Sequence, residues 1–413
     1  MLMSRLRLLL VLASAGCAAN APSTHAGEAQ AHPKPAASPV PEEGLTPRQA
    51  LAREVTASLP RTRVASQEAP FQGEVLAAGT PGVEKRPNDV VIFTVPIGTA
   101  SPVTCLFYPN PIDAGAAARS LFESLPEGIT LERVRATEVK AFKGSPALYL
   151  EGDFSQGGQV GRIKVMVHAD PVLPKSCFHE EMGYAQTFLR VTESVATGLS
   201  STAKEQPVEP YFSDVQVTRV GNQVLGFQSS ALFGAKTGGT IFEGSTTLVR
   251  PGSPTELQFL DTNYWEQTDA EGMLVVKSYS KRVNDAVTAQ VKLSREQDGS
   301  YAVEGQLAGK DVQARLNGEL LGEVSLAQRL RDGLLKGGEA VEAAMWVAPA
   351  NPSAPTRVVF RPRAGAGPRA ATMEAGSISV SVVLDAHGFV ERMETPAGGA
   401  TLMQERISQT GAP

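Results

Sequence analysis

Cysteine and histidine have the strongest potential for chemistry in this chain, and both are few. There are three cysteines and five histidines among 413 residues. Cys177 and His179 lie two positions apart in the segment SCFHEE, so their side chains would share one face of a β-strand. Cys105 lies in a second strand-like segment, VTCLFYP. Three interpretations stay open: a Cys105–Cys177 disulfide, two inert buried thiols, or a metal or thiol site that includes His179.

Sequence motifs of common enzymes are missing. HEEMG at 179–183 lacks the second histidine that a zinc-protease helix carries at i+4. GAKTGGT at 234–240 lacks the order of a phosphate-binding loop, and no G-x-S-x-G, C-x-x-C or dinucleotide fingerprint is present. We therefore predict no catalytic residue, no metal and no cofactor, and a non-enzymatic function. The less favoured alternative is a hydrolase that uses His168 or His179 as general base.

Two tryptophans are candidate ligand-binding residues. Trp265 follows Tyr264 in TNYWEQT, and Trp346 follows Met345 in AAMWVAP. Large apolar side chains of this kind form either a packed core or the wall of an apolar pocket. We predict binding of an apolar small molecule or an envelope protein; the alternative is a structural or assembly subunit of an envelope complex. The net charge of −5, with no basic stripe, argues against a nucleic-acid partner.

The N-terminus is typical of an exported protein. Two arginines precede a short apolar run at 8–13 and small residues, which is the order of a secretory signal peptide, predicted here for 1–16. The run is far shorter than the roughly 20 residues of a membrane-spanning helix. The segment Ser-Ala-Gly-Cys that ends at Cys17 resembles the lipobox of bacterial lipoproteins, which implies a lipidated Cys17. Cleavage after Ala15 is the alternative, and it would release a soluble secreted or periplasmic protein.

The lipobox resemblance also implies a location. Ala18 follows the cysteine where an aspartate favours inner-membrane retention, so we expect an outer-membrane lipoprotein that faces the periplasm and contacts the membrane through its N-terminal lipid. With Cys17 lipidated, two cysteines remain, which suits one disulfide in an oxidising compartment. Residues 17–44 are rich in Ala, Pro and Ser and predict a disordered tether.

Residues 45–205 predict a first domain of α+β class. Helices are expected near 46–59, at 113–126 with Asp113 as N-cap, and at 184–199, where apolar residues recur at i, i+4, i+7, i+11 and i+15. Strand-like segments in hairpin order lie between them, which predicts an antiparallel α+β sandwich. This order of elements is similar to that of PsbP- and Mog1-like proteins.

Residues 206–413 predict a second, β-rich domain. Many alternating segments follow one another with turn signals such as Asp298-Gly299, which indicates an antiparallel meander. One amphipathic segment, SLAQRLRDGLLKGG at 325–338, interrupts them as a helix. A curved sheet with one helix resembles the half-barrels of Lol-type envelope proteins. The predicted fold class of the whole chain is α+β, with the sandwich followed by this mostly antiparallel β half-barrel.

Overall fold

Antiparallel β-sheets dominate the protein, shown here as a computed structural model. Strands hold 56% and helices 13% of the structure. The predicted α+β fold class is therefore wrong, because the helix-forming segments are few and short whereas nearly every alternating segment becomes a strand. The structure describes residues 47–55, 58–65, 69–123, 129–156, 159–203, 208–236, 238–253, 256–284, 286–397 and 399–413. The predicted signal peptide, Cys17 and the predicted tether lie outside these residues.

Two sheets and a long helix form the N-terminal half. Their strands are β1 (Arg61–Ala65), β2 (Phe71–Leu76) and β10 (Leu199–Ser201) in one sheet, and β3 (Gly82–Lys85), β4 (Val91–Val95), β5 (Val103–Phe107), β6 (Ile129–Phe142), β7 (Ser145–Gln156), β8 (Gln159–His168) and β9 (Lys175–His179) in the other. Helix α4 (Ala185–Gly198) follows the predicted periodicity and buries Phe188, Val191 and Val195 in the core that these sheets share. A short helix, α2 (Pro47–Ala52), precedes the first strand.

A disulfide joins the central strand of the seven-stranded sheet, β9, to its neighbour β5. Cys105 on β5 lies directly opposite Cys177 on β9 in antiparallel register, and the two are bonded. Of the three interpretations for these cysteines, the disulfide is confirmed. Both half-cystines are buried in the core beneath α4, so the bond lies inside the packed interior.

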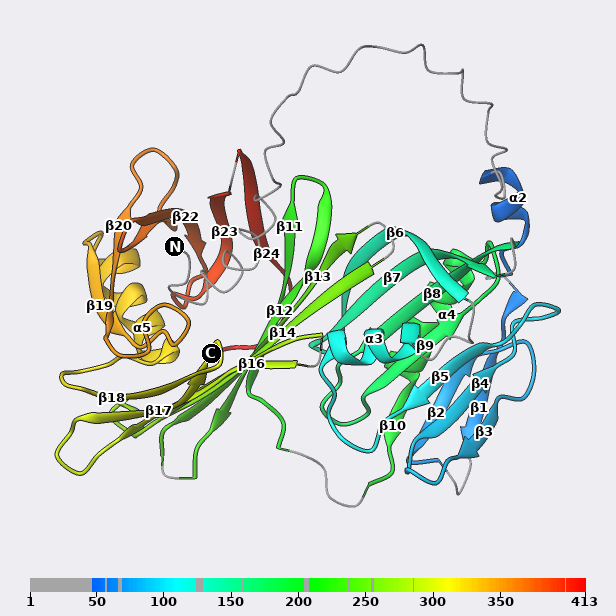
Figure 1. The fold of residues 1–413 in the computed structure, drawn as a ribbon, viewed down its shortest axis with the longest axis horizontal. Coiled ribbons are helices and arrows are strands. Elements are labelled where there is room, and N and C mark those ends of the chain that lie inside the picture. Colours follow the sequence, from blue (N-terminus) through cyan, green and yellow to red (C-terminus); the bar gives the residue numbers. More distant parts are fainter. Residues whose placement is uncertain are drawn as a thin grey trace, which may run out of the picture.

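The C-terminal half is one sheet of 14 strands (Figure 1). They are β11 (Phe212–Val220), β12 (Gln223–Gly234), β13 (Thr240–Ser253), β14 (Glu256–Thr268), β15 (Leu274–Val283), β16 (Ala286–Arg295), β17 (Tyr301–Leu307), β18 (Lys310–Leu316), β19 (Val341–Met345), β20 (Thr356–Pro362), β21 (Ala370–Ala375), β22 (Ile378–Leu384), β23 (Val390–Ala397) and β24 (Ala400–Gly411). Strands β11–β18 and β19–β24 form two meanders, and the pairing of β11 with β24 joins them in the middle.

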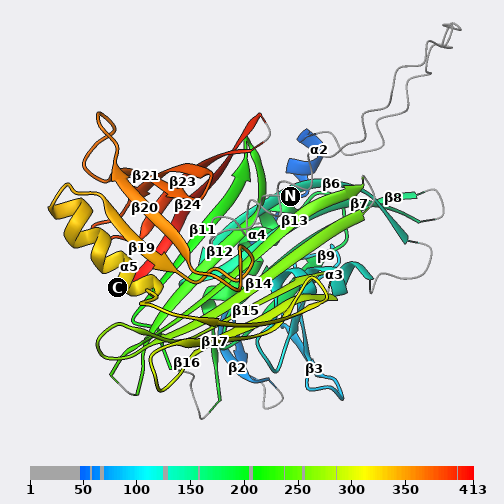
Figure 2. The ribbon, with the colours of Figure 1, turned by 60° about the vertical axis from the view of Figure 1, so that its left-hand side comes forward.

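This large sheet curls around a helix. Helix α5 (Glu323–Arg329) continues as the π-helical segment η3 (Leu330–Lys336), and its Leu326, Leu330 and Leu334 pack on β19–β22. Figure 2 shows α5 beside β19 and β20 at one end of the sheet. We call the face that carries α5 the inner face. Within the described residues the edge strands β18 and β19 do not pair with each other, so the sheet stays open.

The outer face of the large sheet packs against the N-terminal half. Helix α3 (Ala114–Glu123) and strands β7 and β8 contact β11–β14 through a shared apolar cluster, which includes Leu121, Val165 and Phe227. Strand alternation explains the division between the faces: Val249 and Phe259 point to this cluster, and their neighbours Leu248 and Leu260 point to the inner face. The predicted boundary at 205/206 falls within 204–207, outside the described residues.

None of the helices among the described residues is both long enough and apolar enough to cross a bilayer.

Candidate functional site

Buried polar side chains cross the inner face of the large sheet. They come from β11–β14 and β24, and register places them side by side: Thr262 opposite Thr246, Thr246 opposite Gln228, Gln228 opposite Gln216, and Gln216 opposite Arg406. Thr218 lies opposite Gln404 in the adjoining row, and Ser230 lies opposite Asp214. We call these nine residues the polar strip: Asp214, Gln216, Thr218, Gln228, Ser230, Thr246, Thr262, Gln404 and Arg406. All are largely shielded from solvent.

Apolar clusters border the polar strip on both sides. On one side Phe212, Leu232, Phe242 and Tyr264 form a cluster in which the rings of Phe242 and Tyr264 stack. On the other side lies the cluster around α5, which includes Leu248 and many side chains of β19–β23. A polar band between two apolar bands can contact both parts of an amphipathic molecule.

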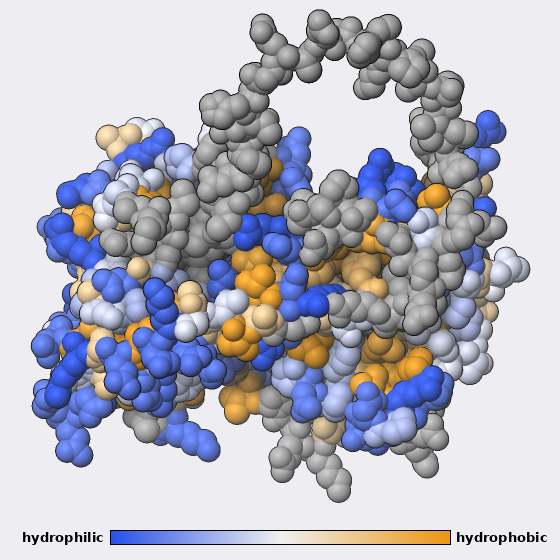
Figure 3. Space-filling view, in the orientation of Figure 1, coloured by the Kyte–Doolittle hydropathy of each residue, from blue (hydrophilic) through white to orange (hydrophobic). Residues whose placement is uncertain are grey.

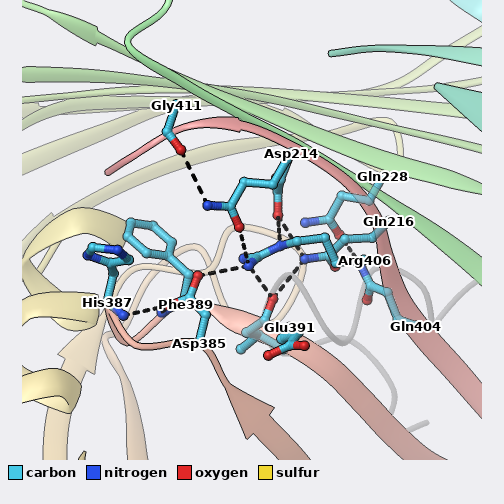
Figure 4. A network of polar contacts seen from close by, with 12 residues as sticks. Asp214, Gln216, Gln228, Asp385, His387, Phe389, Glu391, Gln404, Arg406 and Gly411 are labelled. Atoms are coloured by element: carbon cyan, nitrogen blue, oxygen red, sulfur yellow. Dashed lines mark hydrogen bonds and ion pairs between the residues drawn. The ribbon is translucent and has the colours of Figure 1, made fainter. Parts of the chain in front are cut away.

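Arg406 is the charged centre of the strip (Figure 4). Its Nε donates to Asp214 Oδ2 at 3.2 Å, and its Nη1 donates to Asp385 Oδ2 and Gln409 Oε1, both at 2.8 Å. A β-bulge permits this arrangement, because the ladder between β11 and β24 shifts register beside Ile407. The extra residue turns Arg406 and Gln409 to the same face although they are three positions apart. The guanidinium is thus paired with two carboxylates, Asp214 on β11 and Asp385 directly after β22, and with Gln409 on its own strand.

Several polar atoms of this region have no partner. Asp214 Oδ1 and the hydroxyls of Thr218 and Thr395 are buried without a hydrogen bond. Thr395 on β23 lies opposite Leu402 on β24, two positions from Gln404 on that strand, so it shares the inner face. Most buried polar groups in folded proteins are hydrogen-bonded, and each exception requires an explanation. Binding of a polar group from a ligand would satisfy such atoms.

The two predicted tryptophans lie in different surroundings. Trp346 is fully buried among residues of β15–β18, and its indole N–H donates to the Pro352 carbonyl at 3.0 Å. Trp265 neighbours Tyr264 on β14 and therefore points to the opposite, outer face. The structure therefore does not bring the two indoles together. Trp346 packs as a core residue.

The two histidines of the hydrolase alternative are buried in the N-terminal half. His168 lies opposite Lys175 and His179 lies opposite Lys164 on the paired strands β8 and β9. Burial, and then the charge of Lys175, lowers the pKa of His168 to about 3; burial, and then Lys164, lowers the pKa of His179 to about 4. Both imidazoles are therefore neutral at pH 7, and both side chains are buried.

A small cleft lies where α3 meets the large sheet. Its volume is about 140 Å³. It is lined by Pro111, Ile112, Asp113, Ala114, Ala169, Asp170, Pro171, Phe227, Ser245, Thr247 and Asn263. Its carboxylates are already paired: Asp113 accepts from Asn263 and contacts Arg282, and Asp170 lies 3.7 Å from the Lys175 ammonium. Neither candidate histidine lines it. Among the described residues no group of three or more His, Cys, Asp or Glu side chains could hold a metal ion.

An aspartate beside this cleft caps α3 from the other half of the molecule. Asp261 on β14 accepts hydrogen bonds from the Gly115 and Ala116 amides at 3.1 and 3.0 Å, and from the Thr247 hydroxyl at 2.7 Å. The sequence predicted Asp113 as this cap, but its carboxylate is turned to Asn263 and Arg282 instead. The N-terminus of α3 therefore binds the two halves together.

Acidification should stabilise the protein through Asp261. The pKa of Asp261 is raised from 3.8 to about 6, chiefly by burial. The nearby Asp113 also raises this pKa, whereas the hydrogen bonds from Thr247, Gly115 and Ala116 lower it. Because the folded-state pKa is the higher one, this stabilisation is complete below pH 3.8 and is lost as pH rises through 6. Between pH 7 and 5 we expect a gain of about 1 kcal/mol in the free energy of unfolding.

The Asp261→Asn variant isolates this effect, since the other titrating groups remain. Urea denaturation measures the free energy of unfolding of wild type and variant, and the difference between the two should change by about 1 kcal/mol between pH 7 and 5. A difference that stays constant over this range would contradict the assignment.

Hydrophilic residues cover most of the left-hand part of the face in Figure 3, which holds α5 and the adjoining strands. Hydrophobic residues surface in patches over the middle and the right-hand part. The apolar clusters that border the polar strip consist of buried side chains. The candidate site therefore lies in the interior of the curled sheet rather than on this surface.

Comparison with known proteins gives structural neighbours alone. No family model matches the chain, and no curated protein matches it either. A beta-barrel-like protein of the domain of unknown function DUF1849 from Brucella abortus has 11% identity and a TM-score of 0.39, and covers 50% of this chain and 99% of its own. A DUF1089 family protein from Pseudomonas aeruginosa has 16% identity and a TM-score of 0.25, and covers 41% and 89%. The resemblance of 45–205 to PsbP- and Mog1-like proteins stays a prediction.

Proposed function

We propose that this protein is an exported, non-enzymatic lipoprotein of the outer membrane, and that it binds an apolar ligand on the inner face of its large sheet. The observation that carries the binding proposal is the polar strip, whose buried and unpartnered atoms lie between two apolar clusters. Apolar walls with a few convergent polar groups are typical of small-molecule sites. A protein partner would need an exposed surface, whereas these side chains are internal.

Binding is tested with the neutral dye N-phenyl-1-naphthylamine, whose fluorescence rises in apolar surroundings. We expect saturable binding of one dye per chain by the purified protein without its lipid. Ser230→Phe places a large ring in the polar strip and should weaken dye binding at least about tenfold, since a filled site excludes the dye. The matched control Gln306→Phe, at an exposed position of β17, should leave binding unchanged.

Thermal melts of both variants show whether they are folded. Wild-type protein that binds no dye in a saturable manner would refute the binding proposal, whatever the variants do.

Export is supported by the disulfide, because disulfides form and persist in oxidising compartments. We expect the wild-type chain, expressed in a bacterium, to fractionate with membranes and to start at an acylated Cys17. Cys17→Ala should release the protein into the soluble fraction, because its single membrane contact in this proposal is the lipid. Intact-mass analysis distinguishes the outcomes, and an unacylated wild-type chain that starts at Met1 would overturn the proposal.

A further inference from the structure

The charges of the polar strip favour one kind of ligand head group. Arg406 is the single cation of this network, and its Nε and Nη1 are taken up by Asp214, Asp385 and Gln409, with Nη2 3.5 Å from the Val390 carbonyl. The guanidinium is only 8% exposed. Four of the five N–H donors of Arg406 are thus taken within the protein, which leaves an anionic ligand little to pair with.

Two carboxylates surround this one guanidinium. Asp214 and Asp385 are both buried, so the network carries a net charge of −1 when all three groups are ionised. Both carboxylate oxygens of Asp385 have partners: Oδ2 contacts Arg406, and Oδ1 accepts hydrogen bonds from the His387 and Phe389 amides. The unpartnered oxygen is Asp214 Oδ1, which is an acceptor only.

The geometry of these groups sets the requirement for a ligand. A buried carboxylate oxygen without a partner needs a donor, and a net negative network in a medium of low dielectric attracts a cation and repels an anion. A primary ammonium group has three donors and one positive charge, which matches this requirement.

We propose that the inner face binds amphiphiles whose head group is a primary ammonium, with the ammonium on Asp214 Oδ1 and the chain on the apolar cluster of Phe212, Leu232, Phe242 and Tyr264. This inference rests on the proposed binding function. It adds the class of ligand: cationic amphiphiles with N–H donors, selected against anionic amphiphiles of equal length.

Competition against the neutral dye tests the head-group preference with matched twelve-carbon probes. Dodecylammonium should displace the dye at a concentration at least about tenfold lower than dodecanoate, because only the ammonium pairs with the carboxylate. Asp214→Asn removes the negative charge and should bring the two probes to within about threefold of each other. Glu304→Gln, an equal change of charge at an exposed position of β17, should preserve the preference.

The possible failures are distinguishable. If the wild-type protein binds neither the dye nor any probe, the proposed binding function itself fails. If it binds the dye but dodecanoate displaces it as well as dodecylammonium does, the function stands and the ammonium inference is overturned. This comparison uses wild-type protein alone, so it decides the question even if Asp214→Asn does not fold.

Discussion

Replacing Cys105 and Cys177 together by alanine should lower the free energy of unfolding by about 4 kcal/mol. The disulfide spans 72 positions of sequence, and such a cross-link removes much of the conformational entropy of the unfolded chain. It joins β5 to β9, which pair although α3 and three strands separate them in sequence. Denaturant titration of the oxidised wild type and the double variant measures the difference.

Reduction supplies the control for this prediction. Dithiothreitol should destabilise the wild type by a similar amount and leave the Cys105→Ala/Cys177→Ala variant unchanged. A double variant within about 1 kcal/mol of the oxidised wild type would show that the cross-link contributes little beyond packing.

Arg406→Ala should destabilise the protein by about 3–5 kcal/mol. The substitution leaves Asp214 and Asp385 buried without their cation, and an uncompensated buried charge is costly. The matched control is Arg392→Ala on β23, whose ion pair with Glu394 is about half exposed and should contribute less than about 1 kcal/mol.

A second substitution tests the cause of this loss. Adding Asp214→Asn to the Arg406→Ala variant removes one of the two buried carboxylates that have lost their cation, and it should recover part of the lost stability. If Arg406→Ala costs no more than Arg392→Ala, or if Asp214→Asn brings no recovery, the network around Arg406 is not the electrostatic unit described above.

The sequence predicts many local elements correctly because their periodicity is strong. The helix expected at 184–199 is α4 at Ala185–Gly198, and the segment from 325 falls in α5 and η3. The fold class is wrong because both halves consist mainly of strands, and the helices that stand out in the sequence are minor parts of the structure. Element boundaries and types are local properties, whereas class depends on how much of the chain each type occupies.

The candidate site could not be predicted in the same way. Gln228, Thr246 and Thr262 alternate with buried residues on their strands, and alternation normally places such polar residues in solvent. Only the packing of both faces of the sheet, by α5 on one side and α3 on the other, makes these positions internal. The signal available was indirect: strands with apolar residues on one face and uncharged amides or hydroxyls on the other.

The role of Arg406 could not be predicted from the sequence either, because its orientation depends on the β-bulge beside Ile407. Arg406 lies 192 positions from Asp214 and 21 positions from Asp385 in the chain, so no local motif joins them. The role of Asp261 was unpredictable for the same reason, because it caps a helix that lies 145 positions away in the chain.

The meeting of β11 and β24 has a consequence for biogenesis. Each meander can form from neighbouring hairpins, but the seam between them pairs β11 with β24, which lie almost 200 positions apart, and pairing over so long a separation is slow. Until that seam forms, two half-sheets expose unsatisfied backbone edges that invite association with other chains. A molecule in which β11 and β24 have not yet paired would therefore depend on chaperones more than the folded form does.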